Sequence, residues 1–248
     1  VALADGDASI RFIDASTAHR VDQNWVYGFP ELTTAQRGMI ATAPRISNPG
    51  CYPTGFLALA RPLIESGILP ADCRLNVPAV SGYSGGGKSM IGAHDAGGLA
   101  PQFSYGVNLA HKHLAEMTHY AGLQTPPIFM PSVGDFYAGM LVHLPLHADQ
   151  FSTAVNADQL YQLYADWYAG AALVRMGAAC ANDENTPNML AADALADTDS
   201  MEIFVFSDAQ ARRFWLVSRL DNLGKGASGA AVQNMNIALG IDEAISLA

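Results

Sequence analysis

The sequence has few cysteines and few basic residues, and each shortage excludes a class of protein. Its three cysteines, Cys51, Cys73 and Cys180, are far apart and odd in number. This argues against a disulfide framework and for a reducing compartment, so we expect a cytoplasmic protein. No C-x-x-C pair is present, and the sequence therefore predicts no metal site. Thirteen basic residues against 23 acidic ones give a net charge of −10, whereas a nucleic-acid-binding protein needs a basic surface.

Long apolar runs are also missing. Stretches such as FLALA and IFVF are far shorter than the roughly 18 residues that a membrane span needs, so we expect no membrane partner. No charged segment followed by an apolar one suggests a secretory signal. Half of the 248 residues are apolar, which is enough for a sizeable core. Because the chain is so acidic, any anionic ligand must be held by a few local cations.

Apolar periodicity predicts an α/β protein with several antiparallel strands in the middle and late parts of the chain. The expected strands fall at 10–16, at 73–83, in two short runs within 126–151, at 201–208 and at 212–223. The expected helices are one that follows Gly50 and stops at Gly67, and others at 108–123, 157–170 and 226–240. Residues 181–200 are rich in turn formers and predict a loop.

A glycine-rich stretch at 81–89, SGYSGGGKS, matches two motifs at once. Residues 82–89 fit the P-loop pattern, and residues 82–86 fit the nucleophile elbow of serine hydrolases with Ser84 as nucleophile. Both motifs need a following helix, and the nearby glycines and proline (Gly92, Gly97, Gly98 and Pro101) argue against a long one. The small residues still let backbone N–H groups approach an anion, and Lys88 adds a positive charge. We therefore expect a phosphate cradle here, with a Ser84 hydrolase as the alternative.

Cys51 has the setting of a reactive thiol. It lies in NPGCYPTG, between a forced turn and an apolar helix, where the helix dipole is expected to lower its pKa. The alternative is a buried structural thiol, which suits Cys73 and Cys180. A thiolate nucleophile needs an acid or base, and HKHLAE at 111–116 supplies one. We expect this role for His113, oriented by Glu116 three residues later, with His111 as second choice.

Four blocks of sequence together resemble N-acetyl-gamma-glutamyl-phosphate reductases, which are relatives of aspartate-semialdehyde dehydrogenase. The blocks are NPGCYPTGFLALARPLIESGILP, SGYSGGGKSMI, HKHLAEM and DNLGKGASGAAVQNMN. The resemblance runs from about residue 13 to the end of the chain. Four blocks in the family's order are far more specific than either glycine-rich motif alone.

The resemblance implies a fold in three parts. Residues 1–47 would form a partial Rossmann-type NADP-binding domain, and 48–222 an α+β catalytic and dimerisation domain with a largely antiparallel sheet. Residues 223–248 would form a helix that returns to the cofactor domain. The family begins with a G-x-x-G-x-x-G loop that is not found before residue 10. We therefore expect the chain to start midway through that domain, without roughly the first 60 to 70 residues.

The resemblance also implies a reaction and a set of roles. Cys51 would form a thioester with a small-molecule acyl phosphate, and NADPH would reduce it to a semialdehyde in arginine biosynthesis. Arg20 would bind the substrate phosphate, with Lys88 as a second cation. Four residues would lie at the cofactor's nicotinamide: Ser84, Gly85, Gly86 and Asn222. The protein would be a homodimer or homotetramer. An aspartyl or carrier-bound substrate, as in aspartate-semialdehyde dehydrogenase, stays open.

Overall fold

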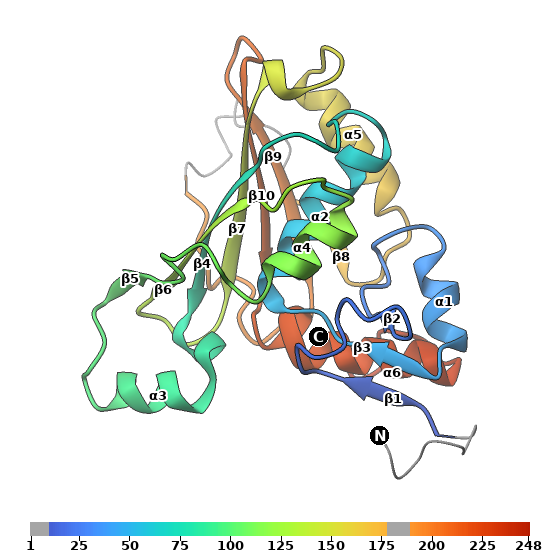
Figure 1. Cartoon of the computed structure of the whole chain (residues 1–248), viewed down its shortest axis with the longest axis vertical. Helices are drawn as coiled ribbons and strands as arrows, with labels where there is room; N and C mark the ends of the chain where they lie inside the picture. The colour runs from blue at the N-terminus through green and yellow to red at the C-terminus, as the bar shows by residue number, and fades with distance from the viewer. Residues whose placement is uncertain (1–9, 178–188) are drawn as a thin grey trace.

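The computed structural model describes residues 10–177 and 189–248, which form a small and a large β-sheet (Figure 1). Cys180 and residues 181–188 of the expected loop lie outside the described residues. The small sheet is parallel, in the order β1-β3-β2. Its strands are β1 (Phe12–Asp14), β2 (Val26–Tyr27) and β3 (Arg45–Ser47). The strand expected at 10–16 is thus confirmed, in a shorter form.

Two helices from opposite ends of the chain pack beside the small sheet. Helix α1 (Gln36–Thr42) contacts α6 (Gly229–Leu239), and α6 also contacts β1. Ile40, Ile46 and Ile237 form the small apolar core between these elements. The last helix therefore returns to the first segment of the chain (Figure 1).

The large sheet has seven strands in the order β5-β6-β4-β7-β10-β9-β8. The strands are β4 (Asn76–Gly82), β5 (Gln102–Ser104), β6 (Ile128–Gly134), β7 (Met140–His147), β8 (Val174–Met176), β9 (Met201–Ser207) and β10 (Arg213–Leu220). Only β4–β6 and β8–β9 pair in parallel within this sheet. The expected α/β fold with a largely antiparallel sheet is confirmed.

Three helices cover one face of the large sheet (Figure 1). Helix α2 (Cys51–Glu65) packs on β7 and β10, α5 (Ala157–Trp167) packs on β8 and β9, and α4 (Leu114–Ala121) packs on α2. Helix α2 lies very close to the sheet because Gly55 has no side chain. A Cβ there would lie 2.7 Å from both Ser218 Oγ and Val142 Cγ2. This close packing fixes the N-terminal end of α2, where Cys51 lies.

The glycine-rich stretch folds differently from the expectation. A 3₁₀ turn, η1 (Tyr83–Gly86), leads directly into α3 (Gly87–Asp95), so a helix of nine residues does follow the motif, although not a long one. Two of the glycines stand at the ends of α3 rather than inside it: Gly87 opens it with φ +68° and Gly97 follows it with φ +69°. None of the residues of α3 is buried, so glycine-rich sequence here gives a short exposed helix instead of a loop.

Two other helices begin later than expected. The helix expected at 108–123 starts at Leu114, because Leu109 adopts φ +55° in a turn closed by its N–H donating to the Gly106 carbonyl. The last helix starts at Gly229 and is preceded by a π-helical turn, η3 (Gly224–Ser228). Among the described residues, no helix has both the length and the apolar character needed to cross a membrane.

Candidate active site

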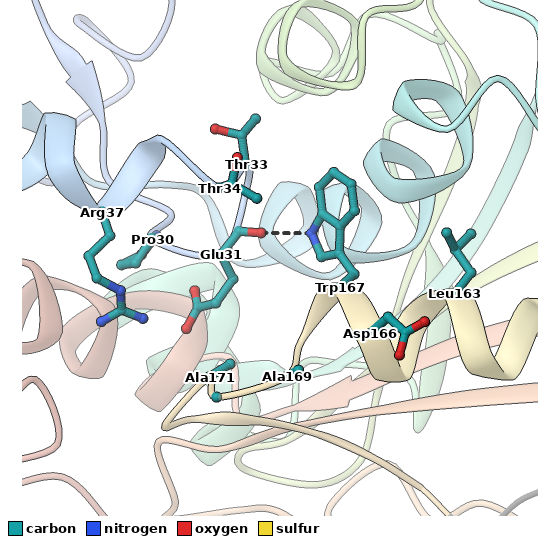
Figure 2. A pocket seen from close by; sticks show the side chains of 11 residues that line it. Pro30, Glu31, Thr33, Thr34, Arg37, Leu163, Asp166, Trp167, Ala169 and Ala171 are labelled. Carbon is teal, nitrogen blue, oxygen red and sulfur yellow. Dashed lines mark hydrogen bonds between the residues drawn. The ribbon is translucent and has the colours of Figure 1, made fainter.

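A cavity of about 360 Å³ lies where the start of α2, the glycine-rich loop, residues 111–113 and η3 meet. It is lined by most of the predicted site residues: Arg20, Cys51, Ser84, Gly85, Gly86, His111, His113 and Asn222. Glu116 lies behind this lining, and Lys88 is exposed on α3 outside it. A second cavity of about 490 Å³, between α1 and α5, contains none of the predicted residues (Figure 2).

Cys51 is the first residue of α2, as the sequence predicts. Its thiol does not have the lowered pKa that the helix dipole led us to expect. The residue is partly exposed at the cavity, but burial of the sulfur raises the pKa of Cys51 to about 11. A hydrogen bond from the Tyr52 N–H and the charge of Arg20 oppose this rise, while the charge of Glu116 adds to it. Desolvation therefore outweighs the helix terminus.

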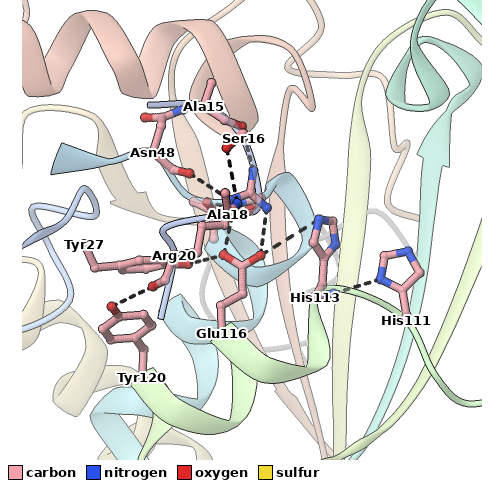
Figure 3. A network of polar contacts seen from close by, with 12 residues as sticks. Ala15, Ser16, Ala18, Arg20, Tyr27, Asn48, His111, His113, Glu116 and Tyr120 are labelled. Atoms are coloured by element: carbon pink, nitrogen blue, oxygen red, sulfur yellow. Dashed lines mark hydrogen bonds and ion pairs between the residues drawn. The ribbon is translucent and has the colours of Figure 1, made fainter. Parts of the chain in front are cut away.

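Glu116 is the centre of a buried polar cluster beside Cys51 (Figure 3). Its carboxylate accepts hydrogen bonds from Arg20 Nη1 at 2.8 Å, Tyr27 Oη at 2.8 Å and the Gly50 N–H at 3.1 Å. Burial raises the pKa of Glu116, and these donors together oppose the rise. A buried carboxylate needs such partners, so the cluster fixes Arg20, Tyr27 and Gly50 together.

His113 occupies the position just before α4 and is buried. Its Nε2 lies 3.9 Å from Glu116 Oε1, as the three-residue spacing suggested. Burial, with the nearby charges of His111, Arg20 and Lys112, lowers the pKa of His113 to about 2. The imidazole is therefore neutral near pH 7. Its Nδ1 has no hydrogen-bond partner within the described part of the chain.

His111 precedes the helix, and both histidines line the cavity. The two rings lie in the turn before α4, with ring centroids 4.6 Å apart, and His111 Nδ1 accepts from the His113 N–H at 3.2 Å. Burial and the charge of Lys112 lower the pKa of His111. Which of the two handles protons stays a prediction.

The missing side chain of Gly50 makes room for the side chains of Arg20, His113 and Glu116. A Cβ at this position would lie 2.6 Å from His113 Nε2, 2.7 Å from Arg20 Nη1 and 2.9 Å from Glu116 Oε1. Each of these distances is shorter than real Cβ contacts allow. A side chain at this position would therefore have to displace the ends of these three side chains, whereas the backbone conformation of Gly50 is an ordinary extended one.

Arg20 is buried and already has three partners. Besides Glu116, it donates from Nε to the Asn48 carbonyl at 3.0 Å and from Nη2 to the Ala15 carbonyl at 3.1 Å. A guanidinium has five N–H groups, so two remain for a ligand in the cavity that Arg20 lines. Its binding of a substrate phosphate stays a prediction.

Ser84 and Asn222 face each other across the glycine-rich side of the cavity. Asn222 Nδ2 donates to Ser84 Oγ at 2.9 Å, and Asn222 Oδ1 accepts from the Gly139 N–H at 2.9 Å. An amide donor cannot remove the proton of a serine hydroxyl, so this arrangement does not activate Ser84 as a nucleophile. It instead holds η1 and the segment before η3 together.

Comparison with known proteins identifies the family. The sequence profile of the semialdehyde dehydrogenase dimerisation domain matches residues 51–222. The N-acetyl-gamma-glutamyl-phosphate reductase of Trichormus variabilis is 46% identical over 251 residues, covering 97% of this chain and 77% of that protein. The enzyme of the same name from Brucella anthropi is 47% identical over 247 residues, with coverages of 97% and 78%. The chain belongs to the N-acetyl-gamma-glutamyl-phosphate reductase family.

Solved structures agree with this fold. Aspartate semialdehyde dehydrogenase II from Vibrio cholerae superimposes with a TM-score of 0.66 at 18% identity, covering 92% of this chain and 72% of that one. The Francisella tularensis aspartate semialdehyde dehydrogenase gives the same TM-score at 14% identity, with coverages of 92% and 74%. N-acetyl-gamma-glutamyl-phosphate reductases and these neighbours are NAD(P)-dependent dehydrogenases, which makes this chain an oxidoreductase.

Several lining residues were missed by sequence reasoning about this reductase. Lys112 stands between the two histidines and lines the cavity, and its position beside them was the only available signal. Tyr27 supports Glu116 from a segment, VYGFP, that carries no motif. Tyr105 and Gly226 also line the cavity. No group of three histidine, cysteine, aspartate or glutamate side chains within residues 10–177 and 189–248 has the geometry of a metal site.

Proposed function

We propose that the protein reduces N-acetyl-gamma-glutamyl phosphate to N-acetylglutamate semialdehyde and phosphate, with NADPH as reductant. The observation that carries the proposal is the position of Cys51. It begins a helix and lines one cavity with Arg20, His113 and the Ser84–Asn222 pair. The identity to N-acetyl-gamma-glutamyl-phosphate reductases over 97% of the chain supports the choice of substrate.

Cys51 forms the bond that starts the reaction. Its Sγ attacks the acyl carbon, the C–O bond to the phosphate breaks, and the acyl group becomes a thioester on Cys51 while phosphate leaves. The first N–H groups of a helix have no partner within it, so the start of α2 offers donors to the developing oxyanion. The Gly50 N–H is already taken by Glu116, and those of Cys51 and Tyr52 point at the Cys51 sulfur, beside which the oxyanion forms.

Proton transfer depends on the substrate. Without it, a thiol with a pKa of about 11 and an imidazole with a pKa of about 2 do not exchange a proton near pH 7. An acyl phosphate in the cavity brings negative charge beside His113, and a nearby anion favours the protonated imidazolium. His113 therefore accepts the thiol proton only in the complex, and returns it to the Cys51 sulfur when the semialdehyde leaves as the thiolate is released. His111 is the second choice for this role.

Cations of the cavity hold the phosphate group. Arg20 has two unused N–H groups, and a guanidinium suits a phosphate by geometry as well as charge. Lys112 adds an exposed ammonium at the same cavity. The predicted role of Lys88 has less support, because Lys88 is exposed on α3 and does not line the cavity.

The glycine-rich wall fits a flat nicotinamide ring. A Cβ on Gly85 would lie 3.0 Å from Ser81 Oγ, and one on Gly86 would lie 2.6 Å from Met90. The two glycines therefore leave this side of the cavity without projecting side chains. Ser84 and Asn222 supply polar groups at its edge. NADPH, when bound, supplies the hydride that reduces the acyl group.

The proposed function includes a division of the chain into three parts. Residues 1–47 contribute to cofactor binding, residues 48–222 form the catalytic and dimerisation part, and residues 223–248 return to the cofactor part.

The outer face of the large sheet is the interface we propose between copies of the chain. Exposed apolar side chains from two strands, Ile128, Met130 and Trp215, lie on it. The matching profile of a dimerisation domain supports this assignment. The protein is then a homodimer, or a homotetramer built from such dimers, which light scattering distinguishes. Partly exposed thiols in the chain suit the reducing cytoplasm, which is the compartment we propose.

The test runs the reaction backwards with the protein expressed at its natural length. N-acetylglutamate semialdehyde, phosphate and NADP should yield NADPH, followed by its absorbance. Cys51→Ser should reduce turnover at least about a thousandfold, because a hydroxyl ionises far less readily than a thiol, whereas Cys73→Ser should not. Higher turnover of aspartate semialdehyde would change the substrate assignment. Ester hydrolysis that survives in Cys51→Ser would restore the Ser84 hydrolase.

A further inference from the structure

Lys225 is a fully buried lysine that the reaction above does not use. It lies in η3, and its Nζ donates to Glu31 Oε1 at 2.9 Å, Glu31 Oε2 at 3.0 Å and Gln233 Oε1 at 2.6 Å. An ammonium has three N–H groups, so every one is matched. Both side chains of the Lys225–Glu31 ion pair are almost completely removed from solvent. Burying two charges is costly, and such a pair is retained where it specifies one arrangement.

The partners of Lys225 come from elements far apart in the sequence. Glu31 follows β2, and its backbone carbonyl accepts from Trp167 Nε1 of α5 at 3.1 Å (Figure 2). Gln233 lies in α6, and its Nε2 donates to Glu31 and to Glu243, both at 2.9 Å. Lys225 therefore links η3 to the small sheet and to the returning helix at one buried point.

The other side of η3 lies against the nucleophile. A Cβ on Gly226 would lie 2.8 Å from Cys51 Cβ, so η3 approaches Cys51 too closely for any side chain at this position. The next residue is also fixed, because the Ala227 carbonyl accepts from Asn48 Nδ2 at 2.8 Å. Gly226 therefore lies on one side of the Cys51 side chain, whose burial raises the pKa of the thiol.

We propose that Lys225 is a positioning residue for Cys51, held by Glu31 and Gln233 so that η3 closes one side of the thiol. Lys225 touches neither substrate nor cofactor in this arrangement. It acts through Gly226, which sets the position and the solvent exposure of the sulfur. The part of this inference that concerns turnover rests on the proposed function, whereas the part that concerns the thiol does not.

The variant that tests it is Lys225→Met combined with Glu31→Gln. Removing the lysine alone would leave a buried carboxylate without its counter-ion and would destabilise the whole protein. The double change removes both charges and keeps the approximate volumes. With η3 released, water reaches Cys51, so its alkylation by iodoacetamide at pH 8 should accelerate at least about tenfold. Turnover should fall about 10- to 100-fold with KM changed less than about threefold, because the sulfur is misplaced.

The control is Arg61→Met with Glu65→Gln. This ion pair is only partly exposed and lies in the last turns of α2, at the end of the helix away from Cys51 and outside the proposed interface. The control should keep both the alkylation rate and kcat within about twofold of the parent. Thermal melting of each protein checks that it is folded. If the Lys225 double variant does not fold, Gln233→Met, which removes one of the three acceptors of the ammonium but keeps the ion pair, carries the same measurements.

The outcomes separate the two proposals. Alkylation and kcat that stay near parental values in a folded Lys225 variant would overturn the positioning role. Equal changes in the Arg61–Glu65 control would do the same, since the effect would then be general loosening. A parent protein that does not turn over the semialdehyde would refute the proposed function, while the alkylation comparison would still decide the role of Lys225.

Discussion

Raising the pH in the absence of substrate should expose how strongly the fold suppresses the thiolate of Cys51. With a pKa of about 11, about one thiol in a thousand is ionised at pH 8. An ordinary cysteine, with a pKa of about 8.5, is about a quarter ionised at that pH. Since only the thiolate reacts with iodoacetamide, alkylation of Cys51 at pH 8 should be roughly 200-fold slower than that of an unperturbed thiol.

The assay follows alkylation of the individual cysteines between pH 7 and 10.5, with quenching in acid and peptide mass spectrometry. The same Cys51 peptide labelled in denaturant provides the unperturbed reference. In the folded protein the rate should still be rising at pH 10, whereas the unfolded chain should level off above about pH 9. Adding an unreactive phosphonate analogue of the substrate should raise the rate near neutral pH, because its charge favours a protonated His113.

A folded-state profile that levels off at or below pH 8 would refute this reasoning. It would mean that the dipole of α2 and the charge of Arg20 outweigh desolvation, and that Cys51 is a thiolate before substrate binds. His113 would then be its protonated partner, in conflict with the lowered pKa of that histidine. The sequence-based expectation of an activated thiol would be right and the substrate-dependent step would be unnecessary.

Three further changes test the surroundings of the thiol. The pKa of His113 is about 2 in the fold and about 6.5 when unfolded, so the unfolded chain gains the proton and stability falls as the pH drops below 6.5. His113→Asn should remove a loss of about 2 kcal/mol between pH 7.5 and 5 in urea unfolding, and His119→Asn, an exposed site, should not. Gly50→Ala should cost about 1–3 kcal/mol by overpacking, whereas Gly38→Ala, with no atom within 4 Å of its Cβ, should not destabilise. Ser84→Ala should weaken cofactor binding about fivefold, seen by NADPH fluorescence, yet leave acyl-enzyme formation intact.

The sequence predicts the parts of the fold that depend on local pattern. The strands β6, β7, β9 and β10 alternate or run apolar over whole segments, so their positions are clear. The helix start at Cys51 is also local, because Pro49 and Gly50 precede an apolar run. Helix α3 was missed because glycines at helix ends and glycines inside a helix look alike in a sequence. Only the φ angles of Gly87 and Gly97 distinguish them.

The sequence predicts which residues form the site, but it predicts their charge partners and pKa values less well. The four sequence blocks bring Cys51, His113 and Asn222 to one cavity. The Arg20–Glu116 pair joins residues 96 positions apart in the sequence, and the resemblance that assigns Arg20 to the substrate phosphate does not indicate this partner. The raised pKa of Cys51 depends on how much protein surrounds the sulfur, which no local pattern records. Helix dipoles can be anticipated from sequence, whereas desolvation cannot.

Two glycines explain why a helix-terminal thiol is nevertheless suppressed. Gly50 lets the imidazole of His113 and the Glu116 cluster approach Cys51 from one side, and Gly226 lets η3 approach from the other. Both approaches exclude water, so the same close packing that positions the sulfur also keeps it protonated. In the substrate-free cavity, the packing that fixes the position of the Cys51 sulfur thus also opposes the ionisation of its thiol. An anionic substrate resolves the conflict, because it brings the charge that makes His113 a better proton acceptor without loosening either contact.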